Sequence, residues 1–266
     1  MIRPEQPASY NPFSWLGRVV INFFTGLGRI SDIYLRSARS IFSRTLFWDN
    51  TFGQMEIIGV KSLPLVLIIS VFTGMVFSLQ IAKIFATFGL TSQLGQGLTL
   101  AFARELAPVL TGVVVAGRIG SSIAAEIGSM KVTEQIEALE SLSTDPIDYL
   151  VAPRILAAAL MLPVLVVFAD FVGICGGFLV AVAYANIPFS NITDGILTFV
   201  NFWDFCGGLV KAFCFGLIIA GVGTFKGLHA DNGAVGVGKA TTEAVVTSMI
   251  TIFILNYFLS MLLYNL

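Results

Sequence analysis

Four charged residues lie inside long apolar stretches of the chain, where few other residues could do chemistry. Arg104 and Glu105 are neighbours, whereas Asp170 and Lys211 each stand alone among apolar residues. Charged side chains at membrane depth cost so much free energy that they pair with one another or line a wet cavity. At about 1.5 Å per helical residue, Lys211 and Asp170 would lie roughly 8–10 Å below the outer boundary, and Arg104 and Glu105 roughly 14–15 Å below it. Lys211 could therefore pair with Asp170 or reach Glu105.

Other residues that commonly act in catalysis or metal binding are few and scattered. His229 is the single histidine, and Cys175, Cys206 and Cys214 lack metal-ligand spacing, so we expect these thiols to be buried small hydrophobes. A membrane enzyme would need a nucleophile with a base, or clustered metal ligands, at membrane depth. The sequence offers neither, and we expect no catalytic residue, metal or cofactor.

Residues 233–239 imitate the start of a phosphate-binding loop but depart from it in two ways. The loop requires Ser or Thr directly after its lysine, where this chain has Ala240. The loop should also follow a buried strand, whereas residues 227–232 do not have the apolar pattern of one. If the protein uses ATP, we expect a partner to hydrolyse it.

The composition indicates a membrane protein. Of the 266 residues, 56% are hydrophobic and 12% are charged, half of the roughly 25% that is usual for a soluble domain. With a net charge of −1, the chain lacks the excess positive charge that attracts the phosphates of a nucleic acid. The first long apolar run begins near Leu63, which is too far into the chain for a signal peptide.

Five apolar stretches are each long enough to cross a hydrocarbon core, which takes about 20 residues. They cover residues 63–82, 94–117, 155–184, 206–225 and 244–266. These stretches predict an all-α, polytopic membrane helix bundle of about five transmembrane helices. Five spans cannot divide into two equal halves and no internal repeat is visible, which disfavours a secondary transporter built from inverted repeats.

The distribution of basic residues predicts the orientation of the bundle. With the N-terminus inside, the inner side holds twelve of the 15 Lys and Arg residues. These twelve are Arg3, Arg18, Arg29, Arg36, Arg39, Arg44, Lys61, Arg118, Lys131, Arg154, Lys226 and Lys239. The outer side holds Lys83, with Lys211 just within the fourth span. The positive-inside rule therefore places the N-terminus in the cytoplasm and the C-terminus outside.

An amphipathic segment precedes the first span. Its apolar residues recur at three- and four-residue steps, and they are Leu16, Val19, Val20, Phe23, Leu27, Ile30 and Tyr34. Arg18, Arg29 and Arg36 share another face. This pattern favours a helix that lies in the inner membrane interface, with a soluble helix packed on a partner as the alternative. We therefore divide the chain into an N-terminal segment, 1–60, and a transmembrane domain, 61–266.

The inner segment between the second and third spans, residues 118–154, contains a short amphipathic helix. Its apolar edge comprises Ile136, Leu139 and Leu142, and its acidic edge comprises Glu134, Glu137 and Glu140. Asp145 is suited to cap the next helix, with Pro146 at its first position. The composition leaves open whether the short helix is simply exposed to solvent or is a docking surface for a cytoplasmic partner.

Small residues recur at four-residue steps in three of the spans. They are Ala116, Gly120, Ala124 and Gly128, then Gly173 and Gly177, then Ala212, Gly216, Ala220 and Thr224. Such spacing lets helix backbones approach closely in lipid. It predicts tight packing, either within one chain or between two copies.

Seven short motifs follow one another in the transmembrane domain. They read RELAPV (104–109), AGRIGS (116–121), AEIGSM (125–130), TEQI (133–136), PR (153–154), GICGG (173–177) and GKATT (238–242). In this order and spacing the chain resembles the MlaE family of ABC permeases from about Lys61 to its C-terminus. The chain departs from that family at Glu243, where relatives often have Arg, and at Asn256, where an acidic residue can occur.

The resemblance implies a set of partners. Members of the family are homodimeric permeases that sit between two cytoplasmic ABC ATPase subunits and work with a periplasmic MCE-domain protein that carries lipid. The short helix at about residues 132–142 would be the coupling helix on the ATPase. The residues implied in coupling are Glu126, Met130, Thr133, Glu134, Gln135, Ile136 and Leu139.

The resemblance therefore implies a permease of the bacterial inner membrane that moves phospholipids to or from a periplasmic carrier and maintains outer-membrane lipid asymmetry. The alternatives are a self-contained secondary transporter and an intramembrane lipid-modifying enzyme. Arg104, Glu105, Asp170 and Lys211 would form an intramembrane charge network. That network either polarises a path for lipid headgroups or serves structure alone.

Overall fold

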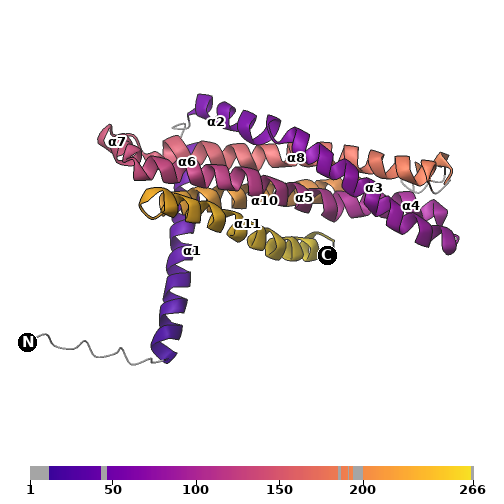
Figure 1. Ribbon diagram of the computed structural model, residues 1–266, viewed down its shortest axis with the longest axis horizontal. Coiled ribbons are helices and arrows are strands. Elements are labelled where there is room, and N and C mark those ends of the chain that lie inside the picture. Colours follow the sequence, from indigo (N-terminus) through magenta and orange to yellow (C-terminus); the bar gives the residue numbers. More distant parts are fainter. Residues whose placement is uncertain (1–11, 43–46, 185–186, 191, 194–199, 265–266) are drawn as a thin grey trace, which may run out of the picture.

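The structure is a computed structural model of the whole chain. It describes all residues except 1–11, 43–46, 185–186, 191, 194–199 and 265–266. The side chains of residues 12–20, 22–23, 27, 42 and 92 also lie outside the description. Helices dominate the described residues, which contain no β-strand (Figure 1), so the all-α prediction is confirmed.

Five long apolar helical segments lie roughly along one axis and form the bundle (Figure 1). They comprise Trp48–Thr87, Leu94–Val132, Ile147–Ala183, Phe202–Leu228 and Gly233–Tyr264. Each exceeds the roughly 20 residues that cross a hydrocarbon core. The five predicted spans are confirmed, and each helix is longer than the apolar stretch that predicted it, because polar residues continue the helical hydrogen bonding at its ends.

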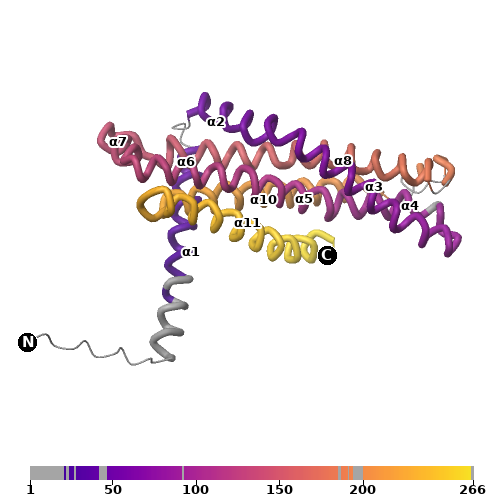
Figure 2. The backbone as a smooth tube through the Cα atoms, in the orientation of Figure 1, coloured from indigo at the N-terminus to yellow at the C-terminus, as the bar shows by residue number. Residues whose placement is uncertain are grey.

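The spans are built from the following helices. The first contains α2 (Trp48–Met55), a π-helical turn (Glu56–Val60) and α3 (Leu63–Thr87). The second runs without a break (Figure 2) through α4 (Leu94–Ala101), α5 (Ala107–Val115) and α6 (Ser121–Val132), joined by π-helical turns at Phe102–Leu106 and Ala116–Gly120. The others are α8 (Ala152–Ala183), which follows a π-helical turn at Ile147–Val151, α10 (Phe202–Leu228) and α11 (Gly233–Tyr264). Ile147 N–H donates to Asp145 Oδ1 over 2.9 Å, which confirms the predicted cap.

Helix α1 (Pro12–Phe42) stands almost at right angles to the bundle near the end that carries α7 (Gln135–Ser141) (Figure 1). Tyr34 Oη donates to the Leu217 carbonyl over 2.8 Å, and Arg36 pairs with Asp145 over 2.7 Å. Burial raises the pKa of Tyr34 to about 12. A helix at right angles to spanning helices lies parallel to the membrane plane, as the predicted interfacial helix requires.

Only part of the predicted amphipathic pattern of α1 can be compared with the structure. The side chains of Leu16, Val19, Val20, Phe23 and Leu27 lie outside the described residues. Among the described side chains of α1, Ile21, Phe24 and Leu35 are exposed apolar residues, and Arg29 and Arg36 are exposed as well.

The predicted stretches of small residues pack within the single chain. A methyl group on Gly74 of α3 would collide with the Gly173 carbonyl of α8, and one on Gly216 of α10 would collide with the Ala158 carbonyl. A methyl group on Gly223 would come within 3.1 Å of the Gly120 carbonyl. These backbone approaches hold α3 and α10 on α8, and the π-helical turn before α6 on α10, so the glycines of these helices pack within one chain.

Helix α11 turns only one narrow face towards the bundle. Its buried residues recur at four-residue steps and are Gly236, Ala240, Ala244, Ser248 and Ile252. Its outward face carries exposed apolar side chains, which are Val246, Ile250, Phe253, Ile254, Tyr257, Phe258, Met261 and Leu262. This apolar face therefore contacts lipid or another chain.

Candidate functional site

The π-helical turn Phe102–Leu106 positions the two charged residues of the second span. Such turns widen a helix locally and are frequent at functional sites. Pro108 follows, and because proline has no N–H, the Arg104 carbonyl lacks its usual donor four residues on. Lys211 Nζ donates to this carbonyl over 2.8 Å. The sequence of this turn thus creates an acceptor for a lysine that arrives from α10.

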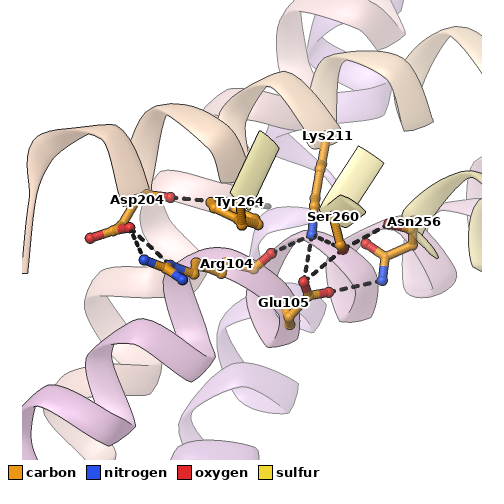
Figure 3. A network of polar contacts seen from close by, with 7 residues as sticks. All are labelled: Arg104, Glu105, Asp204, Lys211, Asn256, Ser260 and Tyr264. Atoms are coloured by element: carbon orange, nitrogen blue, oxygen red, sulfur yellow. Dashed lines mark hydrogen bonds and ion pairs between the residues drawn. The ribbon is translucent and has the colours of Figure 1, made fainter. Parts of the chain in front are cut away.

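Lys211 is the centre of a polar network in the apolar bundle (Figure 3). Its side chain is fully buried and its ammonium contacts Glu105 Oε1 at 2.7 Å, Ser260 Oγ at 2.7 Å and the Arg104 carbonyl. An ammonium has three N–H donors, so each has an acceptor. A buried lysine with all donors satisfied and a carboxylate beside it is compatible with membrane depth.

Helix α11 closes the network with three residues at four-residue steps, which share one face of the helix. Asn256 Nδ2 donates to Glu105 Oε2 over 2.8 Å, and Ser260 Oγ lies 2.8 Å from Glu105 Oε1. The Tyr264 ring lies under the Arg104 guanidinium, with 4.6 Å from its carbon to the ring centroid, and 5.1 Å from Lys211 Nζ. The neutral Tyr264 ring therefore makes cation–π contacts with both Arg104 and Lys211.

A second ion pair ties the π-helical turn to the start of α10. Arg104 Nη2 lies 2.6 Å from Asp204 Oδ1, and Nε donates to the same oxygen over 2.8 Å. The other Asp204 oxygen accepts from the Asn201 N–H over 2.9 Å, which forms a capping box at the helix start. Arg104 and Glu105 are neighbours in the sequence but pair with different residues of α10. Arg104 pairs with Asp204 and Glu105 with Lys211, which lies 7 positions farther along the helix.

The network is open on one side. Arg104 and Glu105 keep 37% and 41% of their side-chain surface exposed, whereas Lys211 and Asp204 keep 0% and 5%. Arg104 borders a pocket of about 320 Å³, which is lined by Arg104, Trp203, Asp204, Cys206, Gly207, Val210, Leu263 and Tyr264. It combines charged and aromatic groups with an apolar wall, and its volume falls in the range of small-molecule sites. The C-terminal end of α11 beside it stops short of the far tips of α3 and α4 (Figure 1).

The structure brings together three of the four predicted charged residues. Arg104, Glu105 and Lys211 meet, and Lys211 pairs with Glu105. Asp170 makes no hydrogen bond or ion pair with them among the described residues: it lines the groove between α8 and α10, and its Oδ1 has no hydrogen-bond partner there. The sequence interpretation missed Asp204, Asn256, Ser260 and Tyr264 as members.

The opposite end of the bundle holds the residues predicted to couple to an ATPase. Thr133, Glu134 and Gln135 are exposed, whereas Ile136 is 9% exposed and packs against its own chain. Met130 and Leu139 are partly buried against the same core. Glu126 pairs with the buried Arg154 over 2.7 Å. The exposed side of α7 therefore consists of polar and acidic residues, and the apolar residues hold it in place.

Residues at both ends of α7 have left-handed backbone conformations. Glu134 and Ser143 have φ values of 58° and 60°, in the left-handed region that few residues other than glycine adopt. Leu142, predicted on the apolar edge, is 76% exposed. Backbone strain at both ends of a short helix, beside an exposed leucine, marks this element as a candidate contact surface.

Two other sequence features have structural explanations. Residues 233–239 form the first turns of α11 and follow helix α10, not a strand, and Lys239 lies 3.4 Å from Asp231. They therefore lack the strand context of a phosphate loop. The three thiols are free, and the prediction of burial was wrong for Cys175, which is exposed on α8, whereas Cys206 and Cys214 are only partly buried.

Comparison with known proteins identifies the family. The family model described as Permease MlaE matches residues 51–262. A protein of Synechocystis described as a probable ABC transporter permease is 45% identical over 252 residues, which cover 94% of this chain and 92% of the relative. A protein of Rickettsia typhi with the same description is 40% identical over 94% of this chain and 96% of its own length. The chloroplastic protein TRIGALACTOSYLDIACYLGLYCEROL 1 of Arabidopsis thaliana is 42% identical over 83% of this chain and 63% of its own length. The chain therefore belongs to the MlaE family and is an ABC transporter permease.

Proposed function

We propose that this permease moves phospholipids between the bacterial inner membrane and a periplasmic MCE-domain carrier, and so maintains the lipid asymmetry of the outer membrane. The observation that carries the proposal is the polar network around Lys211, whose members Arg104, Asp204 and Tyr264 line a pocket with an apolar wall in a membrane bundle. A lipid has both a charged headgroup and apolar chains, and this pocket offers contacts for both. The name of the Arabidopsis relative contains that of a galactolipid, which supports a lipid cargo.

The proposed orientation of the bundle in the membrane rests on its basic residues. The end that carries α1 and α7 would face the cytoplasm, because most of the Lys and Arg residues lie there. The pocket would then open towards the periplasm, where a carrier can reach it. A cytoplasmic ABC ATPase would dock on the exposed side of α7, and ATP binding there would reshape the pocket at the far end.

The permease would act as a homodimer through α11. Its outward apolar face lies beside the network, so two copies meeting there would enclose the two pockets between them. The test is disulfide cross-linking of Ile250→Cys in membranes. We expect cross-linked dimers, whereas Leu160→Cys, also exposed but on α8, should remain monomeric. Equal cross-linking of both variants would contradict this interface.

Affinity purification of the tagged protein in a mild detergent tests the proposed partners. Mass spectrometry should identify an ABC ATPase, an MCE-domain protein and phospholipid in the purified complex. Recovery of the chain alone, under conditions that keep the dimer intact, would instead favour a self-contained transporter or membrane enzyme. Lys211→Ala then separates function from structure, because normal lipid transfer by a folded Lys211→Ala complex would reduce the network to a structural role.

A further inference from the structure

A second cavity lies on a different face of α10 from the charged network. It is a groove of about 400 Å³ between α8 and α10. Its apolar lining includes Val167, Phe171, Ile174 and Phe178 of α8 and Phe205 and Leu209 of α10. Phe171 is 69% exposed and Cys175 is exposed as well, so the groove is open along the outer surface of α8, where a spanning helix meets lipid.

The single charged residue in this lining is Asp170. Its relative exposure is 5%, and its Oδ1 has no hydrogen-bond partner among the described residues. The other buried charged residues in the described part of the chain are Arg154, Asp204 and Lys211, and each has an oppositely charged partner within 2.7 Å. Asp170 is the exception, although its lone carboxylate would be costly at membrane depth.

The chemistry of the groove selects its ligand. A carboxylate without a donor is satisfied best by a cationic donor, and a primary ammonium supplies up to three N–H groups. The apolar walls require that this ammonium be attached to hydrocarbon, and the open side admits a ligand from the bilayer. The volume of the groove lies in the range of small-molecule sites.

We propose that the groove between α8 and α10 is a binding site for a membrane lipid with a primary ammonium headgroup, and that Asp170 accepts the hydrogen bond of that ammonium. The site is separate from the polar network and does not depend on the proposed transport. It requires the permease alone, in a bilayer.

The test uses Cys175, whose thiol lines the groove, as a reporter of occupancy. The purified full-length protein is placed in nanodiscs of phosphatidylethanolamine or of phosphatidylcholine, with matched acyl chains and the same fraction of phosphatidylglycerol. Phosphatidylcholine has the same headgroup charge but no N–H donor. The rate of maleimide labelling is read by mass spectrometry of the Cys175 peptide, and Cys214, outside the groove lining, is the internal reference.

We expect Cys175 to react about threefold more slowly in phosphatidylethanolamine, the factor that an average hydrogen bond in a membrane produces. Asp170→Leu should abolish the difference, whereas Asp148→Asn, in the π-helical turn before α8 and outside the groove, should keep it. Equal labelling of the wild-type protein in both lipids would overturn the proposal whether or not the Asp170 variant folds. Persistence of the difference in a folded Asp170→Leu protein would overturn it too. Protection that requires another membrane protein would assign the groove to a partner helix instead.

Discussion

The ion pair between Lys211 and Glu105 should contribute far more to stability than an ion pair of equal length at the other end of the bundle. Lys226 and Glu243 are also 2.7 Å apart, but their side chains are 26% and 44% exposed, against 0% for Lys211 and 41% for Glu105. The two pairs therefore match in distance and in the exposure of the carboxylate, and they differ in the burial of the lysine.

The magnitude follows from burial. Removing one partner of a buried pair costs about 3–5 kcal/mol, and exposed pairs contribute about 0.2–1 kcal/mol. Because 41% of the Glu105 side chain is exposed, we expect the Lys211→Met variant to lose about 2–3 kcal/mol, less than a fully buried pair would. We expect a coupling free energy of about 1.5–2 kcal/mol between Lys211→Met and Glu105→Gln, below the single-variant cost because Lys211 also binds Ser260 and a backbone carbonyl.

The assay is a double-mutant cycle on each pair, with the free energy of unfolding measured by SDS titration in mixed micelles and helicity as the signal. The cycle with Lys226→Met and Glu243→Gln should give about 0.5 kcal/mol. Coupling energies that agree within about 0.5 kcal/mol, the usual error of additivity, would refute the claim that burial makes the network strong.

Three further predictions concern packing, α1 and α7. Gly74→Ala should lower the free energy of unfolding by about 1–3 kcal/mol, because its methyl would collide with a backbone carbonyl, whereas Gly53→Ala, with open space around it, should raise it by up to about 1 kcal/mol in the same titration. Tyr34→Phe should cost about 0.5–1.5 kcal/mol through loss of its hydrogen bond. Since the folded pKa of Tyr34 is raised to about 12 from 10.0, its contribution is complete below pH 10 and is lost as pH rises towards 12. The difference in phenolate absorbance between the wild type and Tyr34→Phe should place this titration near pH 12, and a titration near pH 10 would contradict the burial of Tyr34. Glu137→Lys on the exposed side of α7 should weaken co-purification of the ATPase at unchanged stability, and full ATPase recovery would remove α7 from the interface.

The charged centre of the site could be predicted because its residues interrupt apolar sequence. Arg104, Glu105 and Lys211 stand out for that reason alone, and the spans around them follow from composition. Depth along a helix was predictable, but the direction of a side chain around the helix was not. Depth alone therefore groups Asp170 with residues to which it makes no hydrogen bond or ion pair in the described structure.

The missed members have ordinary residue types or lay outside the predicted spans. Asp204 lies just before the predicted span, which begins at Cys206, yet the spacing of Asn201 and Asp204 is that of a capping box and starts α10 earlier. Ser260 and Tyr264 lie in an uncharged span, and their role depends on which face α11 turns towards α10. Helix packing decides that face, and a single sequence carries little information on it.

The most direct test of the central claim is lipid transfer by the reconstituted complex. Proteoliposomes that contain the permease, its ATPase and the MCE-domain protein, with a fluorescent phospholipid, are mixed with acceptor vesicles, and transfer is followed with ATP and with a non-hydrolysable analogue. The account predicts transfer that requires ATP hydrolysis and falls at least tenfold in a folded Lys211→Ala complex. Transfer at the same rate without ATP hydrolysis, or unaffected by Lys211→Ala, would contradict an ATP-driven lipid path through this network.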